Sequence, residues 1–140
     1  MLNYIDHPSD ASGTPLLIAH GLFGSGRNWG VIAKRLSDQR RVIAVDMRNH
    51  GQSPREKSNS YTDMAADLAK VIGHIGGPMD VLGHSMGGKA AMTLALTQPD
   101  LVRRHPPVGC GRATGRFGGR TCLAVVLYPV AGCGGQALAA

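Results

Sequence analysis

Three short apolar runs punctuate the first 102 residues, and a turn and a helical pattern follow each of them. Two of them, residues 16–19 and 42–45, are unbroken, and the third, residues 79–82, includes Asp80. An unbroken apolar run of this length is typical of a strand that is buried on both faces. Strands that alternate with helices indicate a parallel sheet with crossover helices. The sequence therefore predicts an α/β fold in which helices flank a parallel sheet.

The helical segments carry their own start and stop signals. Asn28 is expected to cap a helix over residues 29–36, and Ser60, followed by Asp63, resembles a capping box for a helix that runs to about residue 75. A third helix is predicted over residues 86–97. The apolar face of the second helix comprises Met64, Ala65, Leu68, Val71, Ile72 and Ile75. Residues 2–6 are expected to form an edge strand.

A serine flanked by glycines joins the third strand to the third helix, in the pentapeptide Gly83-His84-Ser85-Met86-Gly87. A reactive serine on so sharp a turn needs small neighbours, which the glycines supply. The helix that follows points its N-terminus at the reacting centre, where negative charge develops. We therefore predict Ser85 as a nucleophile and the Met86 N–H as an oxyanion donor. A merely structural Ser85 is the alternative.

Two further loops follow the other predicted strands. His20-Gly21-Leu22-Phe23-Gly24 is expected to supply a second oxyanion donor, the N–H of Leu22, and the alternative is an ordinary glycine-rich turn. The loop at residues 46–53 reads Asp-Met-Arg-Asn-His-Gly-Gln-Ser. We interpret it as a structural loop whose charges brace the strand ends, and contact with substrate is the alternative.

Together these three motifs resemble the α/β-hydrolase superfamily, and in particular the YbfF-type esterases and their mitochondrial relatives. The resemblance covers roughly residues 2–104. It implies hydrolysis of a small-molecule acyl ester or thioester through an acyl-enzyme on Ser85, with no cofactor and no metal. In this family the acid and then the histidine follow the nucleophile on later loops.

The chain departs from that pattern after Ser85. No Asp or Glu occurs beyond Asp100, and His105 stands too early to reach back over the active site. His20 and His84 are weak substitutes, and His7, His50 and His74 have no motif support. Because a serine without a base is a poor nucleophile, the sequence predicts an inactive serine ester hydrolase. The alternative is a fragment or binding module without hydrolase activity.

The net charge of +6 belongs to the end of the chain. Residues 1–102 hold ten basic and nine acidic residues, and the other five basic residues are arginines between 103 and 120. Without aromatic residues interleaved among these bases, nucleic-acid binding is not expected. Cys110, Cys122 and Cys133 fit neither a zinc pattern nor a disulfide framework. We expect reduced thiols, no secretory signal, no membrane span and a cytoplasmic location.

The amino-acid composition changes after Arg104. This change divides the chain into a truncated domain (residues 1–104) and an unrelated tail (105–140). The tail is rich in Gly, Ala, Arg and Cys, which suggests an out-of-frame reading, and a natural truncation is the alternative. The later strands and the lid of the hydrolase fold would then be missing. We expect a poorly packed tail, in which residues 123–130 are the only strand-like run. An open edge beside residues 79–82 should favour self-association.

Overall fold

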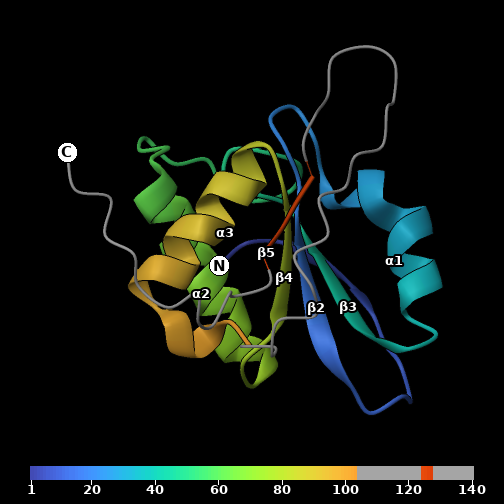
Figure 1. Cartoon of the computed structure of the whole chain (residues 1–140). Helices are drawn as coiled ribbons and strands as arrows, with labels where there is room; N and C mark the ends of the chain where they lie inside the picture. The colour runs from blue at the N-terminus through green and yellow to red at the C-terminus, as the bar shows by residue number, and fades with distance from the viewer. Residues whose placement is uncertain (104–123, 128–140) are drawn as a thin grey trace, which may run out of the picture.

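A sheet with helices on both faces forms the centre of the computed structural model, which describes residues 1–103 and 124–127 (Figure 1). Five strands form this sheet, in the order β1-β3-β2-β4-β5. The strands are β1 (Tyr4–His7), β2 (Gly13–Ala19), β3 (Arg40–Val45), β4 (Asp80–His84) and β5 (Ala124–Leu127). The predicted α/β class is confirmed.

The three central strands run parallel, as predicted. β2 lies between β3 and β4 and pairs in parallel with both. In this register Ala19, the last residue of β2, stands opposite Gly83 near the end of β4. Because the carboxyl ends of parallel strands share one edge of the sheet, the loop after β2 and the turn after β4 emerge side by side.

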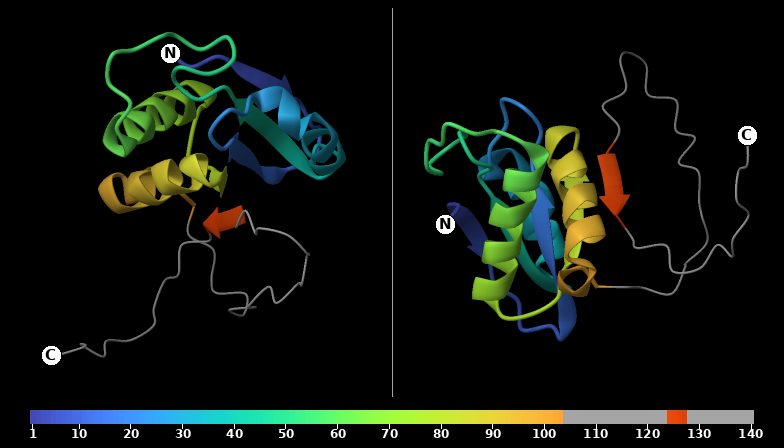
Figure 2. Two further views of the ribbon diagram at one scale, coloured as in Figure 1. Left: turned by 90° about the horizontal axis from the view of Figure 1, so that it is seen from above. Right: turned by 90° about the vertical axis from the view of Figure 1, so that its left-hand side faces the viewer.

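The helices divide unequally between the two faces of the sheet. Helices α2 and α3 cover one face, and α1 with the short helix η1 covers the other (Figures 1 and 2). The helical segments are η1 (Gly26–Trp29), α1 (Gly30–Leu36), α2 (Tyr61–Ile75), α3 (Met86–Thr97) and η2 (Pro99–Leu101). The predicted helices therefore form, with the first one beginning as a 3₁₀ turn.

Alternate side chains of β2 and β3 pack into two separate cores, as expected for strands buried on both faces. Leu17 and Ile43 point towards α2 and α3, whereas Ile18 and Ala44 point towards α1. The larger core also takes the predicted apolar face of α2, of which only Ile75 is partly exposed. Helix α1 adds Ala33 to the smaller core, with Trp29 and Leu36 partly buried beside it.

One of the two predicted helix caps is wrong. Asn28 does not begin the first helix, because η1 precedes it: Asn28 Oδ1 instead accepts from the N–H of Ser25, which is the N-cap of η1, at 2.7 Å. The second cap is confirmed, since Ser60 Oγ accepts from the Asp63 N–H at 3.1 Å. Helix α2 ends at Ile75, and its C-cap Gly76 has a φ of +111°, in the left-handed region that glycine favours.

Both edges of the sheet are antiparallel. The predicted edge strand at residues 2–6 forms as β1, two residues later, and pairs with β3. The predicted open edge beside residues 79–82 is wrong, because β5 pairs with β4 there, with Leu82 opposite Val126. β5 lies within the run predicted at 123–130. The other predictions for the tail, including those for His105 and the three cysteines, concern residues outside the described ranges.

Candidate functional site

Ser85 stands at the junction of β4 and α3 with its residue exposed and its backbone at φ +49°, ψ −110°. A side chain with a Cβ atom rarely adopts this conformation, because it brings Cβ close to the backbone. Such strain persists only where the surrounding structure imposes it, and it concentrates at functional sites. The observed turn therefore has the sharp geometry that the sequence predicts for a nucleophile.

The glycines beside Ser85 are required by close backbone approach. A Cβ atom on Gly83 would lie 2.6 Å from the Gly87 carbonyl oxygen and 2.6 Å from the Gly88 Cα. One on Gly87 would lie 2.3 Å from the Ala19 carbonyl oxygen. All three distances are well below normal contact, so a larger residue at either position would force the strand and the helix apart.

The loop after β2 lies directly against this turn. The Gly87 N–H donates to the His20 carbonyl at 3.1 Å, which ties the first turn of α3 to the end of β2. A Cβ atom on Gly21 would lie 2.5 Å from His84 Nδ1, so the glycine lets the loop pass over the histidine. The structure thus brings Leu22 and Ser85, which are 63 positions apart in the chain, to the same edge of the sheet.

The two N–H groups predicted as oxyanion donors make no hydrogen bond within the described residues. Met86 is the first residue of α3, where the helix has no partner for its N–H. Leu22 is exposed on the loop (56%), and the neighbouring Phe23 N–H is used by His50. Their availability is the property that an oxyanion site needs.

His20 is buried and fully engaged in hydrogen bonds. Its Nε2 accepts from the Met47 N–H at 2.9 Å, so Nδ1 carries the proton and donates to the Gly21 carbonyl at 2.7 Å. Burial lowers the pKa of His20, against a smaller opposing effect of the Gly21 hydrogen bond. Because both ring nitrogens are occupied, His20 braces the loop and is not available as a base for Ser85.

Like His20, the other histidines in the described part of the chain make no hydrogen bond to Ser85. The ring of His84 lies near Trp29, with 6.4 Å between the ring centroids. His74 lies near Tyr4, at 6.5 Å.

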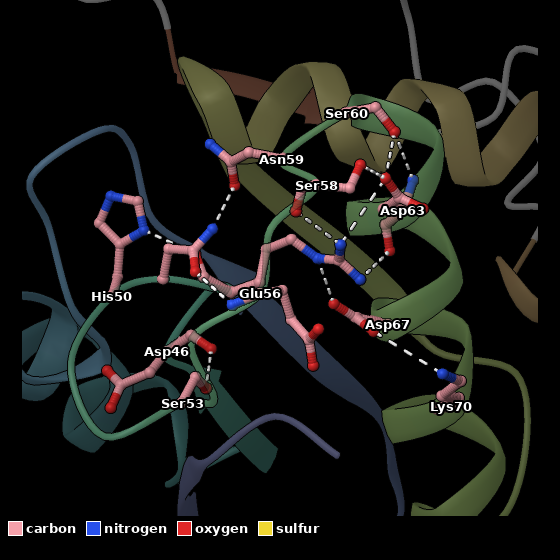
Figure 3. Close-up of polar contacts among 12 residues, drawn as sticks. Asp46, His50, Ser53, Glu56, Ser58, Asn59, Ser60, Asp63, Asp67 and Lys70 are labelled. Atoms are coloured by element: carbon pink, nitrogen blue, oxygen red, sulfur yellow. Dashed lines mark hydrogen bonds and ion pairs between the residues drawn. The ribbon is translucent and has the colours of Figure 1, made fainter.

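The loop after β3 braces the strand ends, as its interpretation as a structural loop predicts (Figure 3). The buried carboxylate of Asp46 accepts from the N–H groups of Gly26 and Gln52, at 2.8 and 2.9 Å, and from Asn3 Nδ2. Burial alone would raise the pKa of Asp46, but these hydrogen bonds outweigh it and hold the pKa below its ordinary value. Arg48 joins the same loop to α2 through Asp67, with Nε 2.7 Å from Oδ2.

Sequence reasoning missed the contact between this loop and the loop after β2. His50 Nε2 accepts from the Phe23 N–H at 3.3 Å, and the rings of His50 and His20 meet edge to face at 5.1 Å. The sequence places His50 in a structural loop and gives it no motif support as a base, and neither prediction brings it to Phe23. The parallel order of β2 and β3 could have indicated that the two loops adjoin.

An open pocket of about 400 Å³ lies beside the candidate oxyanion loop. Apolar side chains dominate it, with His20, His84 and Asn28 as the polar members. Its apolar residues are Leu22, Phe23, Trp29 and Ile32. Among the described residues there is no group of three or more side chains placed to hold a metal ion, and no helix is both long and apolar enough to cross a membrane.

Comparison with protein families decides the classification, because the family model described as alpha/beta hydrolase fold matches residues 14–105. The chain belongs to the alpha/beta hydrolase fold family. The predicted resemblance to YbfF-type esterases is also confirmed, since the chain is 43% identical over 90 residues to the esterase YbfF of Escherichia coli. That match covers 64% of this chain and 35% of the relative.

Other alpha/beta hydrolases match at similar levels. The sn-1-specific diacylglycerol lipase ABHD11 of Danio rerio is 47% identical over 107 residues, which cover 74% of this chain and 33% of the lipase. Among solved structures, a marine microorganism esterase matches with a TM-score of 0.69 and 43% identity, over 74% of this chain and 39% of the esterase. The chain therefore spans about a third of the length of the curated relatives it matches, and its fold is a partial alpha/beta hydrolase fold.

Proposed function

We propose that this chain carries the nucleophile and oxyanion half of a serine ester hydrolase. The observation that carries the proposal is the strained turn at Ser85, set between β4 and α3 with the Leu22 loop fixed against it. The homology to esterases and lipases supports this reaction class. Small acyl esters or thioesters are the proposed substrates.

The proposed chemistry is acyl transfer. Ser85 Oγ would attack the carbonyl carbon, and the carbonyl oxygen would become an oxyanion held by the N–H groups of Leu22 and Met86. Collapse of this intermediate would release the alcohol and leave the acyl group on Ser85, and water would then hydrolyse the acyl-enzyme. Both steps require a base: it takes the proton of Ser85 Oγ and gives it to the leaving alcohol, and it later takes a proton from water and returns it to Ser85 Oγ.

We further propose that this chain turns over esters poorly, because it contains no suitable base. His20 is engaged at both nitrogens, and no side chain of a described histidine hydrogen bonds to Ser85. The sequence adds only His105 after Ser85 and no acid after Asp100. These observations also favour the second candidate function, a fragment or binding module without hydrolase activity.

Covalent labelling of Ser85 separates the candidates. A fluorophosphonate reacts with a serine whose hydroxyl is activated, so we expect labelling of this chain to be slower by roughly 10⁴ than labelling of a complete serine esterase. Ser85→Ala reports background reaction, and Ser9→Ala is the matched control at an ordinary serine. Rapid labelling that Ser85→Ala abolishes and Ser9→Ala retains would show that the chain supplies its own base.

A further inference from the structure

A histidine from the loop after β3 holds the turn that carries the Leu22 N–H. The Phe23 N–H donates to His50 Nε2 at 3.3 Å, across 27 positions of sequence. Because Phe23 provides the proton, Nε2 must be the unprotonated nitrogen, and Nδ1 donates to the Arg48 carbonyl at 2.8 Å. The neutral imidazole therefore bridges the two loops.

The turn needs such a restraint. Phe23 has a φ of +60°, a left-handed conformation that is costly for a bulky residue. Its side chain is 92% exposed, so packing offsets little of this cost. A hydrogen bond from the Gly24 N–H to the Gly21 carbonyl, at 3.0 Å, closes the turn. Within the described residues, the contact with His50 is thus one of three hydrogen bonds to the backbone of this turn, the third being the one from His20 Nδ1 to the Gly21 carbonyl.

The acceptor itself is held in place. The His50 N–H donates to the Met47 carbonyl at 3.0 Å, and its own carbonyl accepts from the Ser53 N–H at 3.1 Å. Its ring packs edge to face against His20, which is buried beneath the loop after β2. A rigid support of this kind transmits its position to the backbone that it binds.

We propose that His50 is a positioning residue for the candidate oxyanion loop, which it holds through its neutral Nε2 and releases when protonated. Protonation would place a donor opposite the Phe23 N–H, so that the hydrogen bond is lost and two donors face each other. The consequence for catalysis rests on the proposed function, because only there is the Leu22 N–H an oxyanion donor.

The charged and titratable neighbours of His50 come from two elements. His20 faces it from the end of β2, and the Asp46 carboxylate lies in the same loop as His50. Arg55 reaches the carbonyl of the preceding Asn49, and the Glu56 N–H donates to the side chain of Asn49. Because His20 and His50 lie in contact, the titration of each ring must be followed through its own signals.

The test is amide hydrogen exchange at Phe23, measured by NMR on the full chain over a range of pH. In the unsubstituted protein we expect the protection of this amide to fall about 3- to 10-fold as His50 becomes protonated, with the midpoint given by the His50 ring signals. His50→Ala should show the low protection at every pH. His50→Gln, whose side-chain oxygen can accept the same hydrogen bond, should restore protection without the pH dependence.

His74→Ala is the matched control and should behave like the unsubstituted chain, since His74 lies by Tyr4, away from the loop. Protection of the Met47 amide, which donates to His20, reports that each variant is folded. Equal Phe23 protection in folded His50→Ala and the unsubstituted chain would overturn the proposal. If His50→Ala does not fold, the unsubstituted chain supplies the test. The proposal is then overturned if the protection of the Phe23 amide does not change as His50 becomes protonated.

The two proposals fail in distinguishable ways. If the proposed function is wrong, Ser85 will not react specifically with an ester or a fluorophosphonate, even with an added base. The protection of the Phe23 amide would in that case still fall as His50 becomes protonated. Failure of the positioning role would appear at the Phe23 amide alone. Where Ser85-specific labelling is measurable, His50→Ala should slow it by about the same 3- to 10-fold, and His50→Gln should recover it.

Discussion

At Ser85 the backbone is strained, and the residues around it show how that strain is maintained. Gly83 and Gly87 have no side chains because β4, the first turn of α3 and the end of β2 pass within contact distance of one another. The hydrogen bond between the Gly87 N–H and the His20 carbonyl joins the same segments. The conformation of the serine is therefore set by its neighbours and not by the serine itself.

Two separate glycine-to-alanine variants, one at a crowded position and one at an open position, measure this crowding. Gly83→Ala would place Cβ 2.6 Å from backbone atoms that cannot rotate away. We expect it to lower the free energy of unfolding by about 1–3 kcal/mol or to prevent folding. Gly73→Ala in α2, where a Cβ atom would meet nothing within 4 Å, should instead raise it by about 0.4–1 kcal/mol. Urea denaturation of both variants would decide, and equal stabilities would contradict the crowding.

At the scale of single elements, strands and helices were predictable wherever the local pattern was strong. The three central strands and α2 follow from apolar periodicity, and the capping box at Ser60 follows from side-chain chemistry. The start of the first helix was misplaced because Ser25 and Asn28 are both good caps, and only tertiary contacts select between them. The contact of His50 with Phe23 and the antiparallel pairing of β5 are long-range contacts, which local patterns do not encode.

The loop after β3 makes the free energy of unfolding depend on pH. The folded state holds the pKa of Asp46 below its ordinary value of 3.8, so the carboxylate stabilises the fold above that pH. This stabilisation is lost as the pH falls through and below 3.8. Asp46→Asn should therefore lower the free energy of unfolding at pH 7 and flatten its decline on acidification. Urea denaturation at pH 7 and pH 3 measures both effects.

Asp10→Asn provides the comparison for Asp46, because Asp10 is exposed and makes no ion pair within the described residues. It should leave both the stability at neutral pH and its decline on acidification nearly unchanged. The buried His20, whose pKa is also lowered, adds to acid destabilisation in every variant and does not affect the comparison. An Asp46→Asn variant with the full acid sensitivity of the original chain would contradict this account.

At the scale of the whole molecule, the chain combines a well-packed sheet with a covering that differs between its faces. Helices α2 and α3 cover one face, and α1 with η1 covers the other (Figure 2). Val31 and Ile32 of α1 and Phe23 of the loop after β2 are exposed. At the β4 edge, β5 supplies the backbone partner. Removing β5 would expose the hydrogen-bonding groups of β4 to other molecules.

Truncation at Arg103 tests the contribution of β5. We expect the shortened chain to self-associate more strongly than the full chain, because the unpaired edge of β4 can add a strand from another copy. Sedimentation velocity of the two chains at matched concentrations would show the difference. Identical, monodisperse monomers would mean that β5 does not protect this edge.

The proposed division of the chain at residue 104 rests on composition and is open to limited proteolysis. Glycine at the density found in 105–140 raises the entropy cost of ordering by about 0.5–1 kcal/mol per residue relative to alanine. Trypsin should therefore cleave first at Arg112, Arg116 or Arg120. Prior cleavage at Arg55 or Lys57 would contradict the proposed boundary.

Ester turnover with and without added imidazole tests the central claim, that the nucleophile and oxyanion groups are assembled but lack a base. Without imidazole, we expect turnover of a short-chain activated ester to equal that of Ser85→Ala. With imidazole, a Ser85-dependent component should appear and grow with imidazole concentration, because the exposed serine is open to an external base. Enzyme-like, Ser85-dependent turnover without imidazole, or no Ser85-dependent component with it, would contradict the account.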